Sequence, residues 1–453
     1  MKRIVTLLLS FLPFGVNAQT VEEIRQALDA YDYETPIAGI HPAIGDSVFT
    51  PLRAQALKAM NRYPEALKEW NSLLQPDSTD AKVLIELAEC YRLTNRTQDA
   101  ALCYGRAVSL QPDNKFFRQQ HIRALLASEK FEAARDASHA WLEKDTVSAT
   151  GYKYLGMAYE AMAKDDPDAL GNAFMAYNAA YRRDSLDAQT VAHIASIFND
   201  NKQYVDAVSV TETYRTTDTL NVDVNRQNAK AYCMLKEYKT AVARYEALKA
   251  MGDHSFTTLY YLGISHYGDN WFYGSQENLL AAYKKNPYDV NLLYYLGKSC
   301  ARTSWKEEGV DFMNQALDIA IPEDSLMERL YDGLVECYKY YPKADPYKRI
   351  DAIKKLYGYN KKYTLFYQIA NIYDRQKDYA NAVHYYEKYM ALVPKNKQMA
   401  LDDEGNPLPD VDTMYLKARR RVEKIKAEDF FRNGAHDDYF EPKPMKVERI
   451  QLK

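Results

Sequence analysis

The sequence predicts an all-α solenoid, in which antiparallel helix pairs stack one after another along the chain. Three observations lead to this prediction. Glycine and proline are sparse, at 17 each in 453 residues, which disfavours multi-turn β architectures and long disordered tracts. A pattern of large and small residues recurs every 34 residues over most of the chain. Within each period, the apolar positions fall on one face of each of two helices.

Residues 1–18 have the pattern of a secretory signal peptide. Two basic residues precede a mainly apolar run from Ile4 to Val16, and small residues lead to a cleavage site after Ala18. No later stretch reaches the roughly 18 apolar residues that a spanning helix needs. We therefore expect an exported protein, periplasmic or secreted and soluble, without a transmembrane segment. An uncleaved amphipathic anchor is the alternative.

The segment 19–46 is expected to hold a capping helix and a linker. The stretch VEEIRQALDAYDY, which begins at Val21, has the spacing of an amphipathic helix. Stacked helix pairs cannot bury their apolar sides alone, so the array needs a polar cap at each end. This segment would cap the amino-terminal end.

Ten repeats are expected within residues 47–396. They would begin at residues 47, 81, 115, 149, 188, 222, 256, 290, 324 and 363, so that every step is 34 residues except two of 39. The longer steps contain AKDDPD (163–168) and YPKADP (341–346), which are turn sequences between the two helices of a repeat. The ninth repeat lacks the alanine and aromatic of the usual second helix, so it is the least regular unit.

Two units show the recurring residues most clearly. The unit from residue 81 carries Leu84, Leu87, Ala88, Tyr91, Ala100, Tyr104, Ala107 and Pro112. The unit from residue 363 carries Phe366, Ile369, Ala370, Tyr373, Tyr379, Ala382, Tyr386, Tyr389 and Pro394. This pattern resembles the tetratricopeptide repeat, which reads W-x2-L-G-x2-Y, then A-x3-F, then P. The resemblance implies a right-handed superhelical solenoid whose concave face binds extended peptides or helices.

Small residues at fixed positions should let the paired helices approach closely. The eighth position of three repeats is glycine, at Gly156, Gly263 and Gly297. The twentieth position is alanine in several others, including Ala66 and Ala134. A small side chain at these positions leaves room for the facing helix.

The carboxyl-terminal part is expected to contain a loop (397–411), a capping helix (412–433) and an irregular tail (434–453). The helix DTMYLKARRRVEKIKAEDFFR places apolar residues on one stripe and basic residues elsewhere. Its positive run could suggest a membrane or nucleic-acid surface. Glu423, Glu428 and Asp429 interrupt that run, so a solvated face is the preferred interpretation.

The sequence contains no motif for catalysis, a cofactor or a metal. The H-E-x-x-H, G-x-S-x-G, phosphate-loop and G-x-G-x-x-G patterns are absent, and the eight histidines occur singly. The five cysteines are scattered fillers, and only Cys90 and Cys103 are close enough to suspect a bridge. A net charge of −3 gives no support to nucleic-acid binding. We expect no enzymatic activity, no cofactor and no metal.

The resemblance also indicates which side chains would face a partner. In the family, first-helix positions 2, 5, 9, 12 and 13 line the concave face. In repeats six to eight and ten these positions include ten residues, here called the groove set: Arg226, Lys230, Tyr260, Tyr267, Tyr294, Lys298, Arg302, Tyr367, Asn371 and Arg375. They would form a cationic and aromatic strip suited to a carboxylate or an acidic peptide. The family's carboxylate clamp is not present as such, and an ordinary solvated surface is the alternative.

The predicted function is therefore a scaffold or adaptor of the cell envelope. It would bind a protein or peptide partner, an acidic one included, in the concave groove. A glycan- or nutrient-binding accessory protein is the alternative, although the four tryptophans fall at packing positions or helix joins. The oligomeric state is left open.

Overall fold

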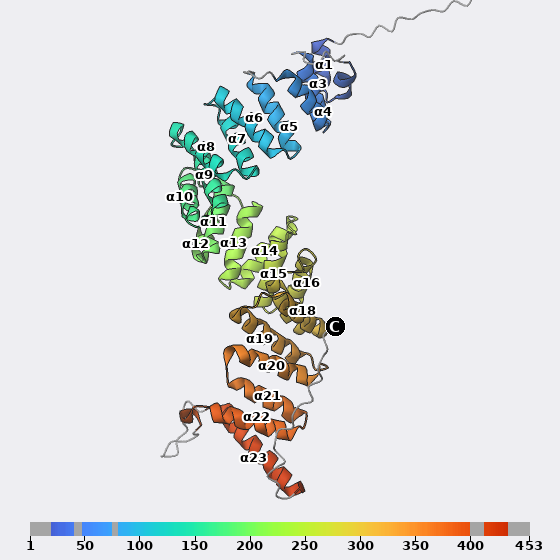
Figure 1. The fold of residues 1–453 in the computed structure, drawn as a ribbon, viewed down its shortest axis with the longest axis vertical. Helices are drawn as coiled ribbons and strands as arrows, with labels where there is room; N and C mark the ends of the chain where they lie inside the picture. Colours follow the sequence, from blue (N-terminus) through green and yellow to red (C-terminus); the bar gives the residue numbers. More distant parts are fainter. Residues whose placement is uncertain (1–19, 40–47, 75–79, 399–411, 434–453) are drawn as a thin grey trace, which may run out of the picture. The chain divides into compact units, whose positions relative to one another are not determined.

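A computed structural model describes residues 20–39, 48–74, 80–398 and 412–433, and in these ranges the regular structure is entirely helical (Figure 1). The expected signal peptide, most of the loop 397–411 and the tail 434–453 lie outside the described residues. The chain divides into two compact units. Unit 1 comprises Met1–Lys202 and Ser209–Thr219, and unit 2 comprises Gln203–Val208 and Leu220–Lys453.

Unit 1 begins with α1 (Val21–Asp29) and α2 (Glu34–Gly39). The helices that follow are α3 (Phe49–Ala59), α4 (Tyr63–Leu73), α5 (Ala81–Leu93), α6 (Thr97–Leu110), α7 (Lys115–Ala127), α8 (Phe131–Lys144), α9 (Ala149–Met162), α10 (Ala169–Tyr181) and α11 (Ala188–Asp200). The division between the units falls inside α12 (Tyr204–Arg215).

Unit 2 continues with the same alternation of first and second helices. They are α13 (Val222–Met234), α14 (Tyr238–Ala250), α15 (Phe256–Gly268), α16 (Phe272–Tyr283), α17 (Val290–Ala301), α18 (Lys306–Ile319), α19 (Asp324–Tyr340), α20 (Pro346–Asn360), α21 (Thr364–Arg375) and α22 (Tyr379–Leu392). A short 3-10 helix, η1 (Lys395–Lys397), precedes α23 (Thr413–Asn433), which packs against α22. Figure 1 shows α19 to α22 as successive layers. The predicted fold class, an all-α solenoid of antiparallel helix pairs, is confirmed.

The first helices begin at capping side chains that recur with the repeat. Asp80 accepts a hydrogen bond from the backbone N–H of Lys82, and Asn114 does so from Phe116 and Phe117. The same role belongs to Ser148, Asp187, Asn221, Ser255 and Asp289. A cap of this kind satisfies a backbone donor that has no partner inside the helix.

Many first helices end at a residue in the left-handed conformation. These residues are Asn61, Asn95, Glu129, Lys202, Lys236, Asn270 and Lys377, with φ between 58° and 66°. The next N–H then reaches back across the last turn, as when Arg96 N donates to Tyr91 O at 2.8 Å. This Schellman-type ending reverses the chain so that the second helix returns antiparallel to the first.

The expected close approach of the paired helices is confirmed at the small residues. Ala66 and Ala134 are fully buried. A Cβ atom added to Gly297 of α17 would lie 2.9 Å from the carbonyl oxygen of Gly309 in α18, so these two backbones are in contact. At Gly156 the close neighbour is a side chain, because an added Cβ would lie 2.7 Å from the ring of Tyr177.

The five cysteines are buried and free, so the suspected bridge between Cys90 and Cys103 is wrong. Burial raises the pKa of both thiols to about 11, which makes them poor nucleophiles at neutral pH. They act as small apolar side chains within the helix packing, as the scattered spacing indicated.

The last helix is held by both apolar and charged contacts. Ala418, Val422 and Ile425 of α23 are buried. Arg421 makes two parallel bonds to Asp374 of α21, from Nε to Oδ2 at 2.8 Å and from Nη2 to Oδ1 at 2.7 Å. The expectation of a wholly solvated basic face is therefore wrong for Arg421, which docks the helix.

Candidate functional site

All ten residues of the groove set lie in unit 2, nine of them on α13, α15, α17 and α21 and Arg302 directly after the end of α17. Tyr267, Tyr294 and Lys298 come together where α15 and α17 are neighbours, and Arg302 joins them at the end of α17. All four gather near Glu336, a residue of α19 that lies outside the groove set. We call these five residues the Glu336 cluster.

Lys298 is the centre of the Glu336 cluster. Its Nζ atom lies 2.9 Å from Glu336 Oε2, and only 14% of the side chain is exposed. The same atom lies 5.6 Å from the ring centre of Tyr267 and 5.3 Å from that of Tyr294. Burial alone would lower the pKa of Lys298, but the bond to Glu336 and the two nearby tyrosines hold that pKa above its ordinary value. Lys298 therefore stays charged.

Arg302 shares the same acid. Its Nη1 atom lies 3.7 Å from Glu336 Oε1, and its guanidinium packs over Phe272 at 4.4 Å and Tyr340 at 4.8 Å. One carboxylate thus pairs with two cations and leaves one net positive charge, and the rings fix the positions of the cationic side chains.

Reasoning from the sequence missed Glu336 because the ninth repeat looked irregular. The signal was available in the repeat frame. Positions 5, 9 and 13 of that repeat are Glu328, Asp332 and Glu336, so the strip changes sign between repeats eight and ten. The predicted cationic strip therefore meets an acidic first helix.

The tyrosines of the groove set contribute mainly to packing between helices. Tyr294 is only 8% exposed. Tyr267 meets Tyr295 edge to face at 5.7 Å, and Tyr260 stacks on Phe256 at 5.5 Å. Burial raises the pKa of Tyr260 and of Tyr267. These phenols are neutral hydrogen-bonding groups at the edges of an aromatic layer.

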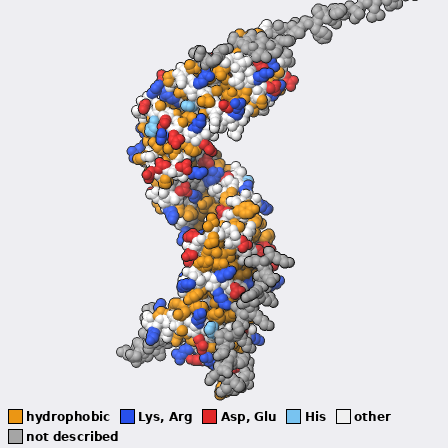
Figure 2. All heavy atoms as spheres, in the orientation of Figure 1, with side chains coloured by type: hydrophobic (Ala, Val, Ile, Leu, Met, Phe, Trp, Pro, Cys, Tyr) orange, Lys and Arg blue, Asp and Glu red, His pale blue; other side chains and the backbone are white. Residues whose placement is uncertain are grey.

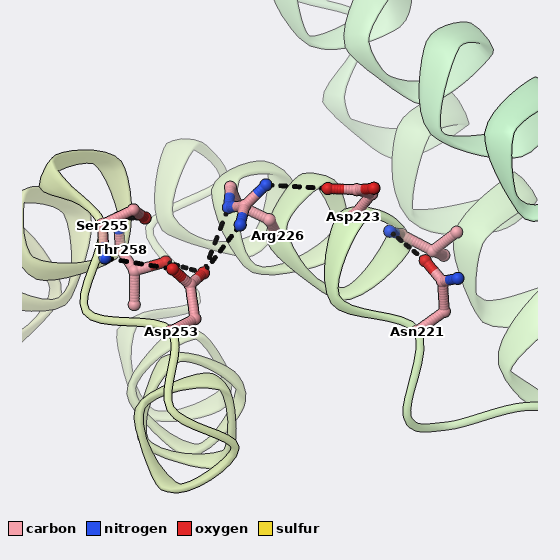
Figure 3. A network of polar contacts seen from close by, with 7 residues as sticks. Asn221, Asp223, Arg226, Asp253, Ser255 and Thr258 are labelled. Carbon is pink, nitrogen blue, oxygen red and sulfur yellow. Dashed lines mark hydrogen bonds and ion pairs between the residues drawn. The ribbon is translucent and has the colours of Figure 1, made fainter. Parts of the chain in front are cut away.

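Arg226 is engaged within unit 2 rather than presented freely. Figure 3 shows its guanidinium between Asp223 and Asp253. Arg226 Nη1 lies 2.9 Å from Asp223 Oδ1, and Nη2 lies 2.9 Å from Asp253 Oδ2. Asp253 also accepts hydrogen bonds from Thr258 Oγ1 at 2.7 Å and from Ser255 N at 3.0 Å. Lys230 lies one turn further along α13 and is half-buried.

The environment of Asp253 strongly favours its charged form. Burial acts to raise the pKa of this carboxyl, but the hydrogen bonds from Thr258, Ser255 and Arg226 outweigh burial and lower the pKa to about 2. The Arg226–Asp253 pair therefore ties α13 to the turn before α15.

The residues of repeat ten divide into two kinds. Asn371 donates to the carbonyl of Tyr367 at 2.8 Å and accepts from the Tyr386 hydroxyl at 3.1 Å. The ring of Tyr367 packs against Tyr386 and Tyr389, so Tyr367 and Asn371 support the helix pair. Arg375, at the end of α21, is exposed and has no ion pair with any described residue.

One tyrosine of repeat ten lies elsewhere than its sequence position suggested. Tyr385 occupies the twenty-third position of the repeat, and this position predicts a side chain on the outer side of α22. The structure instead stacks its ring on Tyr373 at 5.6 Å, and the side chain is half-buried. The prediction is wrong because large aromatic side chains reach across the helix pair.

An acid–histidine–tyrosine cluster in unit 1, in which Tyr177 is buried and the Glu160 and His193 side chains are partly exposed, is the arrangement that most resembles catalytic chemistry. Glu160 accepts from Tyr177 Oη at 2.5 Å and lies 2.8 Å from His193 Nδ1. Tyr177 is fully buried, and burial raises the pKa of its phenol well above the ordinary value. A substrate could not reach that oxygen, so the cluster joins α9, α10 and α11.

Among the described residues, no group of His, Cys, Asp or Glu side chains is arranged to hold a metal ion. None of the described helices is both long and apolar enough to cross a membrane. Trp70 and Trp141 are buried, whereas Trp271 and Trp305 are exposed by 53% and 42% at helix joins. Figure 2 shows positive, negative and hydrophobic side chains intermingled on the face in view, without one continuous basic surface.

Comparisons with known proteins agree with the repeat pattern. The family model for the tetratricopeptide repeat matches residues 81–114 and 363–396. A curated relative, the DnaJ homolog subfamily C member 7 homolog of Dictyostelium discoideum, is 27% identical over 173 residues. That match covers 38% of this chain and 29% of the relative, so the chain spans under a third of the relative's length.

Solved structures give weaker similarities. YrrB, described as a tetratricopeptide repeat protein with an unusual peptide-binding site, is 16% identical with a TM-score of 0.35, over 42% of this chain and 96% of YrrB. The human IFIT1 dimer with PPP-AAAA is 13% identical with a TM-score of 0.38, over 82% of this chain and 95% of that one. TM-scores this low say nothing about a shared ligand.

Proposed function

We propose that this chain, a tetratricopeptide repeat protein, is a non-enzymatic scaffold that binds a peptide or protein partner through the groove set of unit 2. Proteins built from such repeats bind peptide or protein partners. The groove set lies on the three successive first helices α13, α15 and α17 and on α21, which offer a long contact area without a deep pocket.

The Glu336 cluster is the observation that supports this proposal most strongly. Its two cations and two tyrosines are already fixed by contacts within the chain, so little side-chain freedom is lost when a partner binds. Because Glu336 neutralises only one of the two cations Lys298 and Arg302, the cluster keeps a net positive charge, and we expect the partner to place an acidic group beside its aromatic and hydrogen-bonding contacts. Binding at this cluster should therefore weaken as the salt concentration rises.

We also propose that the protein acts outside the cytoplasm. The pattern of residues 1–18 supports export, with cleavage after Ala18. Amino-terminal sequencing of the mature protein from its native source tests this. A mature chain that begins at Gln19 is expected, and an intact Met1 in the native protein would contradict export.

Partner capture from a native extract, with crosslinking, tests the scaffold function. The test variant is Arg302→Glu, which places a second acid beside Glu336 on a partly exposed side chain. The matched control is Arg420→Glu on the exposed face of α23. We expect the amount of captured partner to fall about tenfold for the test variant only.

Two outcomes would contradict this function. Equal capture by the wild type, the test variant and the control would exclude the Glu336 cluster as a binding surface. Capture of a polysaccharide in place of a protein would favour the glycan-binding alternative.

A further inference from the structure

A cleft of about 310 Å³ lies beside the turn between α19 and α20, where the ninth repeat carries its five additional residues. Turn residues 341, 342 and 344–346 and the end of α21 line this cleft. Tyr338 and Ile372 supply apolar lining. Arg349 of α20 and Arg375 of α21 both reach this cleft.

Arg349 is an unsatisfied donor within this cleft. Its Nε atom is shielded from solvent and has no hydrogen-bond partner in the described part of the chain. Burial, and then the positive charge of Arg375, lower the pKa of Arg349. Neither arginine has an ion pair with a described residue, whereas Arg226 and Arg421 are each paired with an aspartate.

The one acid that lines the cleft does not resolve this imbalance. Asp345 accepts a hydrogen bond from the backbone N–H of Tyr347 at 2.9 Å and so caps α20. Two guanidinium groups facing one cleft, one of them with a buried unsatisfied donor, cost stability until an anion enters. A charged group in a cleft whose pKa is shifted by burial and by a like charge is a candidate for a binding site.

We propose that this cleft binds a carboxylate of an acidic side chain in the partner peptide, held jointly by Arg349 and Arg375. This inference rests on the proposed scaffold function and adds the chemical class of one partner group. A guanidinium presents parallel N–H donors that match the two oxygens of a carboxylate. The apolar walls strengthen these bonds by excluding water.

A carboxylate fits the cleft better than a phosphate does. Phosphates are usually bound by backbone N–H groups at a helix amino terminus. At the start of α20, Pro346 has no N–H, and the side chain of Asp345 already occupies the N–H of Tyr347. The charge of Asp345 would also repel a doubly charged phosphate more strongly than a singly charged carboxylate.

Fluorescence anisotropy with the full chain tests the proposal. The probe is a fluorescein-labelled peptide amide containing two glutamates, and its glutamine counterpart is the uncharged probe. The variants are Arg349→Gln and Arg375→Gln, with Arg420→Gln as a control that removes the same charge from the exposed face of α23. We expect each cleft variant to bind the acidic probe about tenfold more weakly, while the control binds like the wild type.

Four results would overturn the proposal. These are no binding of the acidic probe to the wild type, equal affinities for the cleft variants and the control, equal binding of the glutamine probe, and displacement by inorganic phosphate at lower concentration than by acetate at equal ionic strength. None of these results affects the outcome of the Arg302→Glu capture experiment. Failure of the cleft proposal is therefore distinguishable from failure of the proposed scaffold function.

Thermal unfolding without peptide gives a second measurement. Arg349→Met removes the unsatisfied donor and the repulsion from Arg375, so we expect its melting temperature to equal or exceed that of the wild type. A lower melting temperature would mean that Arg349 stabilises the free protein, which would overturn the proposal.

Discussion

The two longer repeats, one in each unit, share a length but differ in charge. The fourth repeat has AKDDPD between α9 and α10, and the next first helix, α11, ends at Asp200. The ninth repeat has YPKADP between α19 and α20, and its next first helix, α21, ends at Arg375. An insertion of equal length is thus followed by a first helix that ends in an acidic residue in unit 1 and by one that ends in a basic residue in unit 2.

The local backbone also differs between the two turns. The backbone of Asp345, with φ −58° and ψ 118°, lies outside the helical region, and its side chain caps α20. Asp168, at the matching place before α10, is in the helical region and makes no capping bond. The length of the inserted turn therefore does not determine the charge or the backbone conformation of the surface that it forms. The capping residue and the charge at the end of the following helix decide whether a turn can become an anion-binding cleft.

The largest effect is expected at Asp253, which pairs with Arg226 in unit 2 as Asp187 pairs with Lys153 in unit 1. Asp253→Asn should lower the free energy of unfolding of unit 2 by about 2 kcal/mol, because it removes a charge-assisted pair. The folded pKa of about 2 lies below the ordinary 3.8, so this stabilisation is present above pH 4 and is lost as pH falls from about 4 to 2.

Urea unfolding at several pH values, with hydrogen exchange to follow α13 and α15, measures this effect. Wild type and variant should differ at pH 6 and converge near pH 2. A difference that stays constant over this range would show that the carboxylate charge is not responsible.

A second, smaller effect comes from exchanging the residues that end the two first helices. Arg375→Asp gives unit 2 the residue found at the equivalent position of unit 1, and it should weaken binding of the acidic probe by more than tenfold, or about 1.4 kcal/mol. Asp200→Arg should not create binding in unit 1, since one arginine alone lacks its partner. Strong binding of the acidic probe gained through Asp200→Arg would contradict the conclusion that two arginines are required.

The left-handed helix ends offer a matched test of stability in the two units. Glu129 in unit 1 and Lys236 in unit 2 have φ of 58° and 66°, which an L side chain adopts at a cost. Glycine at either site should raise stability by about 1 kcal/mol. Asn95→Gly should gain less, because asparagine tolerates this conformation. Chemical unfolding measures all three, and an equal gain at Asn95 would contradict the strain explanation.

The smallest effect is expected at two open glycines, one in each longer repeat. A Cβ added to Gly171 in α10 or Gly358 in α20 would have no neighbour within 4 Å. Alanine at either position should raise stability by about 0.5 kcal/mol through helix propensity alone. Thermal unfolding checks this, and a loss at one site would show that its longer repeat is packed differently.

The fold could be predicted from the sequence because repetition multiplies a weak signal. Ala81, Lys115 and Ala149 are the first residues of their helices, and each lies at a starting position given by the 34-residue period. Tyr385 could not be placed, because its position in the repeat does not say how far a tyrosine ring reaches.

The candidate site was only partly accessible from the sequence. Position in the repeat indicated which helices Lys298 and Arg302 lie on, and it could have indicated Glu336 as well. It could not reveal that Glu336 pairs with both cations, or that Arg349 Nε lacks a hydrogen-bond partner among the described residues. Those facts depend on side-chain geometry across neighbouring repeats. The ninth repeat, which contains both Glu336 and Arg349, is also the unit that departs most from the repeat pattern.

Photo-crosslinking of the full chain with an acidic peptide, followed by mass spectrometry, tests most directly whether unit 2 holds the binding site for acidic groups. The peptide carries a photoreactive group next to its glutamates, and the glutamine peptide is the control. Crosslinks should map to residues 338–376 and should be lost in Arg349→Gln. Crosslinks that map to unit 1, or that persist in that variant, would contradict the account.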